Sequence, residues 1–233
     1  MPQLVWFRND LRIADNPALT AACGHREAVR AVFTLTPEQW QEHDWSPARV
    51  QLVLAHLHAL GTRLAALGIP LDILHCRRFD DSRQALMDYC REQQISHVHF
   101  NEEYGINERR RDKALRDQLG AMDVAVNKYR DQTVTPVGSV LTGQGEPYSV
   151  FTPFSRRWRS WIDDNQPGLF AEPKPVAEAI APPKLPDSVS GFAPAPPPFV
   201  ETGEVAAHQQ LEQFLDQQAG DYKAQRDFPA LDG

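Results

Sequence analysis

The sequence predicts an α/β protein with a Rossmann-like, doubly wound, five-stranded parallel sheet. Three observations lead to this fold class. Five short segments are apolar and rich in β-branched or aromatic residues, and helical segments with one apolar face alternate with them. The chain also has 233 residues, 42% of them hydrophobic, which is enough for one α/β domain and an appendage. Strict alternation favours right-handed crossovers, with helices covering both faces of the sheet.

Each element has its own local signals. The expected strands cover residues 3–8, 28–35, 70–75, 97–101 and 122–127, and the expected helices cover residues 16–23, 47–67, 80–94 and 105–119. Asn16 and Ser46 are good helix-capping residues, and each is followed by a proline at the first helical position. Gly68 ends the second helix. That helix has an apolar stripe at three- and four-residue steps, formed by Val50, Val53, Leu54, Leu57, Leu60, Leu64 and Leu67.

The pattern changes after about residue 128. A helix carrying Trp158 and Trp161, which we expect to be packing residues, precedes a stretch with ten prolines between residues 167 and 198. Such a stretch cannot form regular helix or interior strand, so we expect an extended connector. A last helix follows at about residues 203–219, with Val205 and Leu211 on its apolar side.

These changes divide the chain into three expected parts. Residues 1–130 form the α/β domain, and residues 131–200 form a connector with one helix and the proline-rich linker. Residues 201–233 form the last helix and the start of a further, truncated domain. The extended linker and terminal helix are typical of a bridge to another domain rather than of an isolated module.

The amino-acid composition narrows the classes of function that are compatible with this chain. The formal net charge is −7, which argues against a DNA-clamping surface on this part of the protein. Cys23, Cys76 and Cys90 have no paired spacing, so we expect buried, reduced thiols in a cytoplasmic protein and no metal site. The chain has no secretion signal and no apolar run long enough for a membrane span. The basic run Arg109–Arg111 favours a solvated helix face, with nucleic-acid contact as the alternative.

The segment from residue 101 to residue 112 is the main candidate for ligand binding. It directly follows the fourth strand and contains several amide and carboxylate side chains. At the carboxyl end of a strand, such groups can hold a heterocycle with adjacent N–H and amino donors. The structural alternative is a helix start whose acidic residues complement the helix dipole. Phosphate-binding glycine loops are missing, and no residues form a self-contained catalytic set.

Four segments, residues 4–19, 101–112, 142–154 and 220–229, resemble the photolyase/cryptochrome family, and bacterial cyclobutane pyrimidine dimer photolyases in particular. The resemblance implies a light-dependent DNA repair enzyme. In this family an antenna chromophore, methenyltetrahydrofolate or a deazaflavin, passes excitation energy to FAD, and the reduced flavin donates an electron to the dimer.

The resemblance also assigns residues. Asn107 and Glu108 match contacts to a folate-type antenna, most closely 5,10-methenyltetrahydrofolate, and His43 matches a second position of that pocket. Tyr222 matches an FAD contact, and Arg226 matches a residue that lies toward DNA. The resemblance covers the front half of the family, so we expect a monomeric fragment without catalytic residues that does not repair DNA alone. Damaged DNA would be bound by the C-terminal domain.

Two other functions remain as alternatives. A cryptochrome-type blue-light sensor would have the same front half. A nucleotide-binding stress-type α/β protein would share the fold class but should carry a glycine-rich phosphate loop, which is absent from this sequence.

Overall fold

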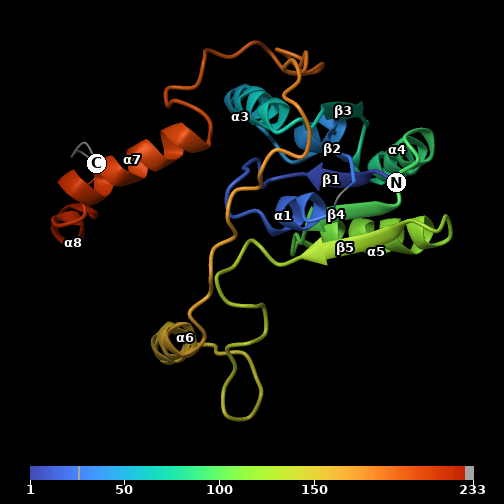
Figure 1. Ribbon diagram of the computed structural model, residues 1–233. Helices are drawn as coiled ribbons and strands as arrows, with labels where there is room; N and C mark the ends of the chain where they lie inside the picture. The colour runs from blue at the N-terminus through green and yellow to red at the C-terminus, as the bar shows by residue number, and fades with distance from the viewer. Residues whose placement is uncertain (26, 229–233) are drawn as a thin grey trace.

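The computed structural model describes residues 1–25 and 27–228, and a parallel five-stranded sheet lies at its centre (Figure 1). The strands are β1 (Gln3–Phe7), β2 (Val29–Leu35), β3 (Leu71–His75), β4 (His97–Asn101) and β5 (Ala125–Tyr129). Their order is β3-β2-β1-β4-β5, and every neighbouring pair is parallel. The order reverses between β1 and β4, as in a doubly wound sheet. The predicted fold class is therefore confirmed.

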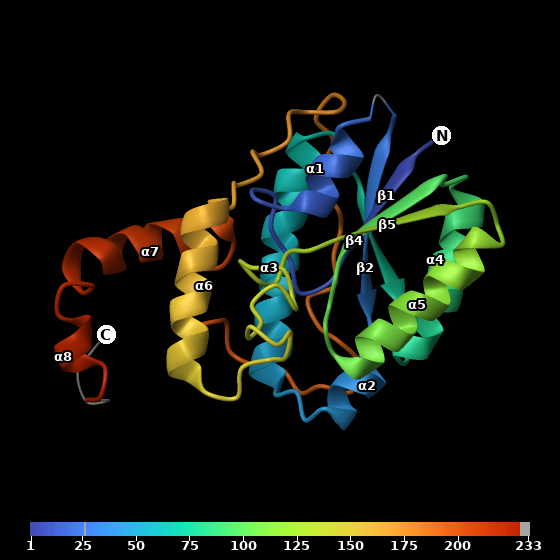
Figure 2. The same ribbon diagram turned by 90° about the horizontal axis from the view of Figure 1, so that it is seen from below.

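Helices cover both faces of the sheet (Figure 2). Strand β1 alternates between the two cores: Val5 and Phe7 pack on the side of α1 (Pro17–Cys23) and α3 (Pro47–Ala66). Leu4 and Trp6 pack on the side of α4 (Phe79–Glu92) and α5 (Ile106–Gly120). This arrangement explains why the central strand is apolar from Leu4 to Phe7, since both of its faces are buried.

The capping predictions are confirmed. Asn16 accepts a hydrogen bond from the Leu19 amide at 3.1 Å, and Ser46 accepts one from the Arg49 amide at 3.2 Å. Gly68 follows α3 with a φ of +75°, the left-handed conformation that glycine favours. The predicted stripe of α3 is buried at Val50, Leu54, Leu57, Leu60, Leu64 and Leu67, and Val53 is half-buried.

Two elements differ from the predictions. Strand β5 begins at Ala125 rather than at residue 122, because a turn with Asp123 at a φ of +57° separates it from α5. The short helix α2 (Pro37–Glu42) was not predicted. Only Trp40 of this helix is buried, so six residues with one apolar contact give no periodic signal.

The proline-rich segment lies along the α/β domain and contains no helix or strand among the described residues between α6 (Phe151–Asn165) and α7 (Glu204–Gln217). The Val176 amide donates to the Leu67 carbonyl and the Ile180 amide to the Ala65 carbonyl, both at 3.0 Å. Val189 completes the core on the α1 and α3 side. The connector therefore docks on backbone carbonyls at the end of α3.

The last three helices pack little on the sheet. α6 and α7 have no buried residue, so Trp158 and Trp161 are only half-buried and lie outside both cores, contrary to their expected packing role. The short helix α8 (Tyr222–Gln225) was not predicted. Residues 229–233, the end of the part expected over 201–233, lie outside the described residues.

The cysteine prediction is correct for Cys76 and Cys90, which are buried and free, whereas Cys23 is free but partly exposed. Burial raises the pKa of Cys76 to about 11, so this thiol is unreactive near neutral pH. Among the described residues no cluster of potential ligands could hold a metal ion. None of the described helices has the length and apolar character needed to span a bilayer.

Candidate functional site

The reversal of strand order places the carboxyl ends of β1 and β4 side by side, but polar side chains fill the crevice between them. Asn101 donates to Asp10 Oδ2 at 2.6 Å and to Asn16 Oδ1 at 2.9 Å. Its own Oδ1 accepts a hydrogen bond from the Ala18 amide at 3.2 Å. Asn101, the first residue of the predicted binding segment, therefore joins β4 to the start of α1 and is not free to bind a ligand.

A buried ion network continues from this crevice. Arg8 donates to Asp112 at 2.8 Å, and Arg111 donates to Glu103 and to Asp112, both at 2.8 Å. Both guanidinium groups also lie near the Trp6 ring, with centroid distances of 4.7 Å to Arg8 and 4.6 Å to Arg111. Arg111 was expected on a solvated helix face, and this was wrong, because its side chain is only 5% exposed and pairs with buried carboxylates.

Asp10 lies beside this network and is half-buried. Burial raises the pKa of Asp10 above its ordinary value, while the Arg8 amide, which donates to it at 2.8 Å, and the Arg8 charge act in the opposite direction. The loop after β1 is therefore held by a carboxyl group whose bonding partners are all part of the fold.

A cavity of about 310 Å³ opens next to this network, at the carboxyl ends of β1 and β2. We call it the His43 cavity. Aromatic, cationic and acidic side chains line it: Phe33, Trp40, His43, Trp45, Phe79, Arg8, Arg49, Arg111, Glu103 and Glu108. It combines flat apolar walls with charged groups, which suits a planar polar ring.

Stacked aromatic rings form one wall of the His43 cavity. Trp40 and Trp45 stack with their ring centroids 4.6 Å apart and nearly parallel planes, and the Arg49 guanidinium lies 3.8 Å above the Trp45 ring. His43 caps the C-terminus of α2, and its ring meets Phe79 edge-on at 6.3 Å. The unpredicted helix α2 therefore supplies Trp40, and its C-cap residue supplies His43.

Glu108 reaches the cavity from the first turn of α5. Its carboxylate folds back over Gly105, and a Cβ atom at this position would displace the Glu108 side chain from its present place. Asn107 is exposed and is not part of the lining. The structure thus brings His43 and Glu108 together in one cavity and leaves Asn107 just outside it.

Tyr222 and Arg226 do not join this site. They belong to the region of α8, which Figure 1 shows at the far end of α7, away from the sheet. Tyr222 meets the Phe214 ring edge-on at 6.0 Å, and Arg226 lies 3.8 Å from the Asp227 carboxylate. Both side chains are exposed.

Several lining residues were missed from the sequence. Trp40, Trp45 and Phe79 come from three separate segments and meet only through packing of α2, α3 and α4 around the sheet. One signal was available for Trp45, because it stands two residues after His43 in the same short loop. Glu103 gave no usable signal, since its neighbour Glu102 is equally acidic but lies outside the cavity.

Comparison with known proteins gives consistent results. The family model described as DNA photolyase matches residues 3–177. The deoxyribodipyrimidine photo-lyase of Salmonella typhimurium is 39% identical over 236 residues, covering 99% of this chain and 49% of the relative. The chain therefore spans about half the length of the curated relatives it matches.

Solved structures show the same likeness. A bacterial class III photolyase from Agrobacterium tumefaciens superposes with a TM-score of 0.78 and 28% identity, covering 99% of this chain and 48% of that chain. A Synechocystis cryptochrome superposes with a TM-score of 0.73 at 20% identity, over 97% of this chain and 49% of that chain, and shares the fold alone.

Proposed function

Since this chain belongs to the DNA photolyase family, we propose that it forms the antenna-chromophore part of a light-dependent DNA repair enzyme. The full enzyme would be a deoxyribodipyrimidine photolyase that splits pyrimidine dimers by electron transfer from reduced FAD. The observation that carries the antenna role is the His43 cavity, where two residues proposed for chromophore binding, His43 and Glu108, line one space with aromatic walls.

The lining fits the ring system of a folate antenna. The Glu108 carboxylate can accept two hydrogen bonds, as an aminopyrimidinone ring with adjacent N–H and amino groups requires. Trp40, Trp45 and Phe79 supply flat apolar surfaces for the ring. When bound, the chromophore would absorb light and transfer the excitation energy to the flavin.

The cavity volume and the exposed position of Asn107 suggest how a folate would lie. At about 310 Å³ the cavity suits the bicyclic head group better than a whole folate molecule. Asn107 stands at its rim, so we place the remaining part of 5,10-methenyltetrahydrofolate over this side chain. A deazaflavin is a longer tricyclic ring, and it would need the aromatic walls to move apart.

The other assignments concern the whole protein. We propose that Tyr222 contacts FAD and that Arg226 lies toward damaged DNA, in agreement with the exposure of both side chains. No catalytic residue is proposed within residues 1–228, and the α/β domain is proposed to act as a monomer. The photolyase function is preferred to a cryptochrome sensor because the curated relatives with 35–39% identity are named deoxyribodipyrimidine photo-lyases.

The test is a Glu108→Gln substitution, followed by titration of the purified protein with 5,10-methenyltetrahydrofolate and measurement of its bound absorbance. Loss of a charge-assisted hydrogen bond should reduce the binding free energy by about 1.5–3 kcal/mol, or about ten- to a hundredfold in affinity. Glu92→Gln, at an exposed site on α4, is the matched control and should bind as the parent does. Equal affinity of the two variants would contradict the assignment of Glu108.

A second measurement separates photolyase from cryptochrome. Full-length protein illuminated with dimer-containing DNA should restore the pyrimidines, and a Glu108→Gln variant should repair more slowly in weak light but keep its activity. Absence of light-dependent repair by the full-length parent protein would favour the sensor instead.

A further inference from the structure

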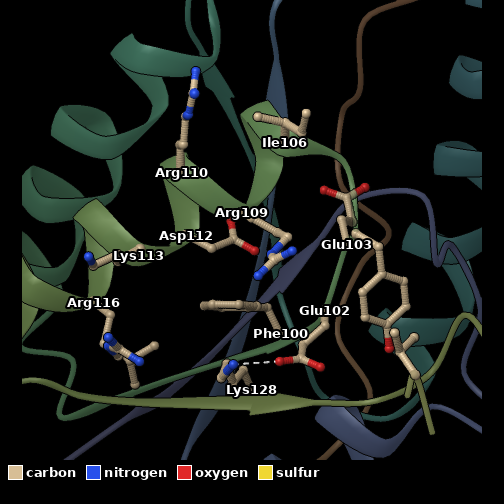
Figure 3. A pocket seen from close by; sticks show the side chains of 13 residues that line it. Phe100, Glu102, Glu103, Ile106, Arg109, Arg110, Asp112, Lys113, Arg116 and Lys128 are labelled. Atoms are coloured by element: carbon tan, nitrogen blue, oxygen red, sulfur yellow. Dashed lines mark hydrogen bonds and ion pairs between the residues drawn. The ribbon is translucent and has the colours of Figure 1, made fainter. Parts of the chain in front are cut away.

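A second cavity lies on the opposite face of α5 from the His43 cavity. It has a volume of about 570 Å³ and is bounded by α5, the carboxyl ends of β4 and β5, and Val137 of the following segment (Figure 3). With 3.6 residues per turn, Glu108 and Arg111 face the His43 cavity, whereas Arg109 and Arg116 face this one. The two cavities are therefore separate sites that share only the Glu103 side chain. We call this second one the α5–β5 cavity.

The charge of the α5–β5 cavity is strongly positive, although the chain as a whole is acidic. Arg109, Arg110, Lys113 and Arg116 project from α5 around it. Within the described part of the chain, the first three have no ion-pair partner, and Arg116 has only the adjacent exposed Asp117 at 3.6 Å. Figure 3 shows Arg109 and Arg116 on the side of α5 that faces β5, over Phe100 and Lys128.

The carboxylates of the α5–β5 cavity are already neutralised. Glu102 pairs with Lys128 at 2.5 Å. Asp112 pairs with Arg8 at 2.8 Å, and Glu103 pairs with Arg111 at 2.8 Å. Among the described residues, Arg109 and Arg110 therefore have no anionic partner, and Arg116 has only the exposed Asp117, so an external ligand with several negative charges could pair with these arginines.

The cavity also has apolar surface and an unused hydrogen-bonding group. Ile106, Val126 and Val137 line it, and the Ile106 side chain is 70% exposed. The Tyr104 hydroxyl is buried among the lining residues and makes no hydrogen bond to any residue that the structure describes. A buried hydroxyl without a partner is unfavourable, so its presence in the wall of a cavity points to a polar ligand atom.

We propose that the α5–β5 cavity binds a nucleoside polyphosphate. The phosphates would lie on Arg109 and Arg116. Each planar guanidinium group can donate two parallel hydrogen bonds to the oxygens of a phosphate. The base would lie against Val126 and Val137, within reach of the Tyr104 hydroxyl. This mode uses side-chain cations, which agrees with the absence of a glycine-rich phosphate loop. The proposal does not rest on the antenna function, because the two cavities lie on opposite faces of α5.

The test is isothermal titration of the protein with ADP, with pyrophosphate and with adenosine. ADP should bind more tightly than either part alone. Arg109→Ala/Arg116→Ala should weaken ADP binding at least about tenfold, because two charge-assisted contacts are lost. Arg156→Ala/Arg157→Ala changes the net charge equally at exposed sites on α6 and should leave the affinity unchanged.

Tyr104→Phe gives an independent readout. It should weaken ADP binding without lowering the free energy of unfolding, because the hydroxyl has no partner in the free protein. The proposal is overturned if ADP does not bind, if both double variants weaken binding equally, or if pyrophosphate binds as tightly as ADP. The proposal is also overturned if Tyr104→Phe lowers the free energy of unfolding and leaves the affinity for ADP equal to that of the parent.

Discussion

At the scale of single residues, the ion network of Arg8, Glu103, Arg111 and Asp112 is the feature on which the site depends most. All four side chains are at most 11% exposed. Such a network contributes little net stability against an apolar core, but removal of one partner leaves a charge buried without compensation. The network fixes the start of α5 relative to β1, and the His43 cavity and the α5–β5 cavity both depend on that position.

Arg111→Met should therefore lower the free energy of unfolding by about 3–5 kcal/mol, because Glu103 and Asp112 would both lose a buried cationic partner and share only Arg8. Urea denaturation followed by circular dichroism measures the change. Arg110→Ala, on the exposed face of the same helix, is the control and should change stability by less than about 0.5 kcal/mol. Similar losses for the two variants would show that the network does not hold α5.

His99 gives the fold a pH dependence. Its side chain is 1% exposed, with Gln3 Oε1 at 2.8 Å from one ring nitrogen and the Tyr129 hydroxyl at 2.9 Å from the other. The pKa of His99 is lowered from 6.5 to about 4. Burial is the main cause, and the charges of the neighbouring His97 and His25 make smaller contributions. The folded state therefore keeps this ring neutral where the unfolded chain binds a proton.

Stability should fall as the pH is lowered from about 6.5 to about 4, because the unfolded state gains a proton that the folded state does not. The contribution of His99 to this fall should be about 1–3 kcal/mol. His99→Gln keeps hydrogen-bonding groups but cannot titrate, so its free energy of unfolding should depend less on pH in this range. His75→Gln, at an exposed position, is the control. Identical pH profiles for parent and His99→Gln would contradict this assignment.

At the scale of elements, the end of α3 decides where the proline-rich connector docks. Gly68 has a φ of +75°, and a Cβ atom there would come within 2.8 Å of the Ala177 backbone. Glycine is therefore needed for two reasons: the left-handed conformation and the close approach of the connector. Gly138 has a similar φ of +82°, but nothing lies within 4 Å of its Cβ position.

This pair of glycines allows a matched comparison. Gly138→Ala should lower the free energy of unfolding by about 1–2 kcal/mol, since alanine disfavours the left-handed region. Gly68→Ala should lower the free energy of unfolding by about 1–3 kcal/mol more than Gly138→Ala does, because it also displaces the connector. Urea denaturation measures both variants, and faster tryptic cleavage after Lys184, in the docked connector, should accompany only the second. Equal losses at the two positions would indicate that the connector does not press on Gly68.

At the scale of the whole molecule, the α/β domain and the last two helices differ in how they are held. The first turn of α7 is fixed by Glu204, which accepts the Ile13 amide at 3.0 Å and the Ala14 amide at 2.8 Å and also pairs with Arg63. Beyond this turn, Leu211 and Leu215 are more than half exposed, and α8 has no buried residue. The anchoring of this region therefore weakens with distance from residue 204.

Limited digestion with trypsin should cut first after Lys223 and Arg226, which lie in the exposed region of α8. The chain through about residue 165 should stay intact for longer, because most of its basic residues lie within helices and strands, where hydrogen bonds hold the backbone. Mass spectrometry of the early fragments identifies the order of cleavage. First cleavage within α3 or α5, before the sites near α8, would contradict the expected distribution of stability.

The sequence alone determined the fold class, because each expected strand and major helix carries its own local signal. Apolar runs mark β1 to β4, Asn16 and Ser46 mark helix starts, and Gly68 marks a helix end. The fifth strand was predicted three residues early, since Val124 is apolar and belongs to the same run as the strand. Helix α2 was missed because a single buried residue, Trp40, gives no period.

The site was predictable only in part, for a physical reason. His43 and Glu108 were identified from the sequence, but their contact with one cavity depends on how α2 and α5 pack at the carboxyl ends of the strands. The sequence also did not predict the direction in which each side chain of α5 points. Arg109, Arg110 and Arg111 are adjacent in the sequence, but Arg111 is buried in an ion network whereas Arg109 and Arg110 are exposed. Only tertiary packing decides this, because charge and propensity are properties of a residue, whereas burial is a property of what surrounds it.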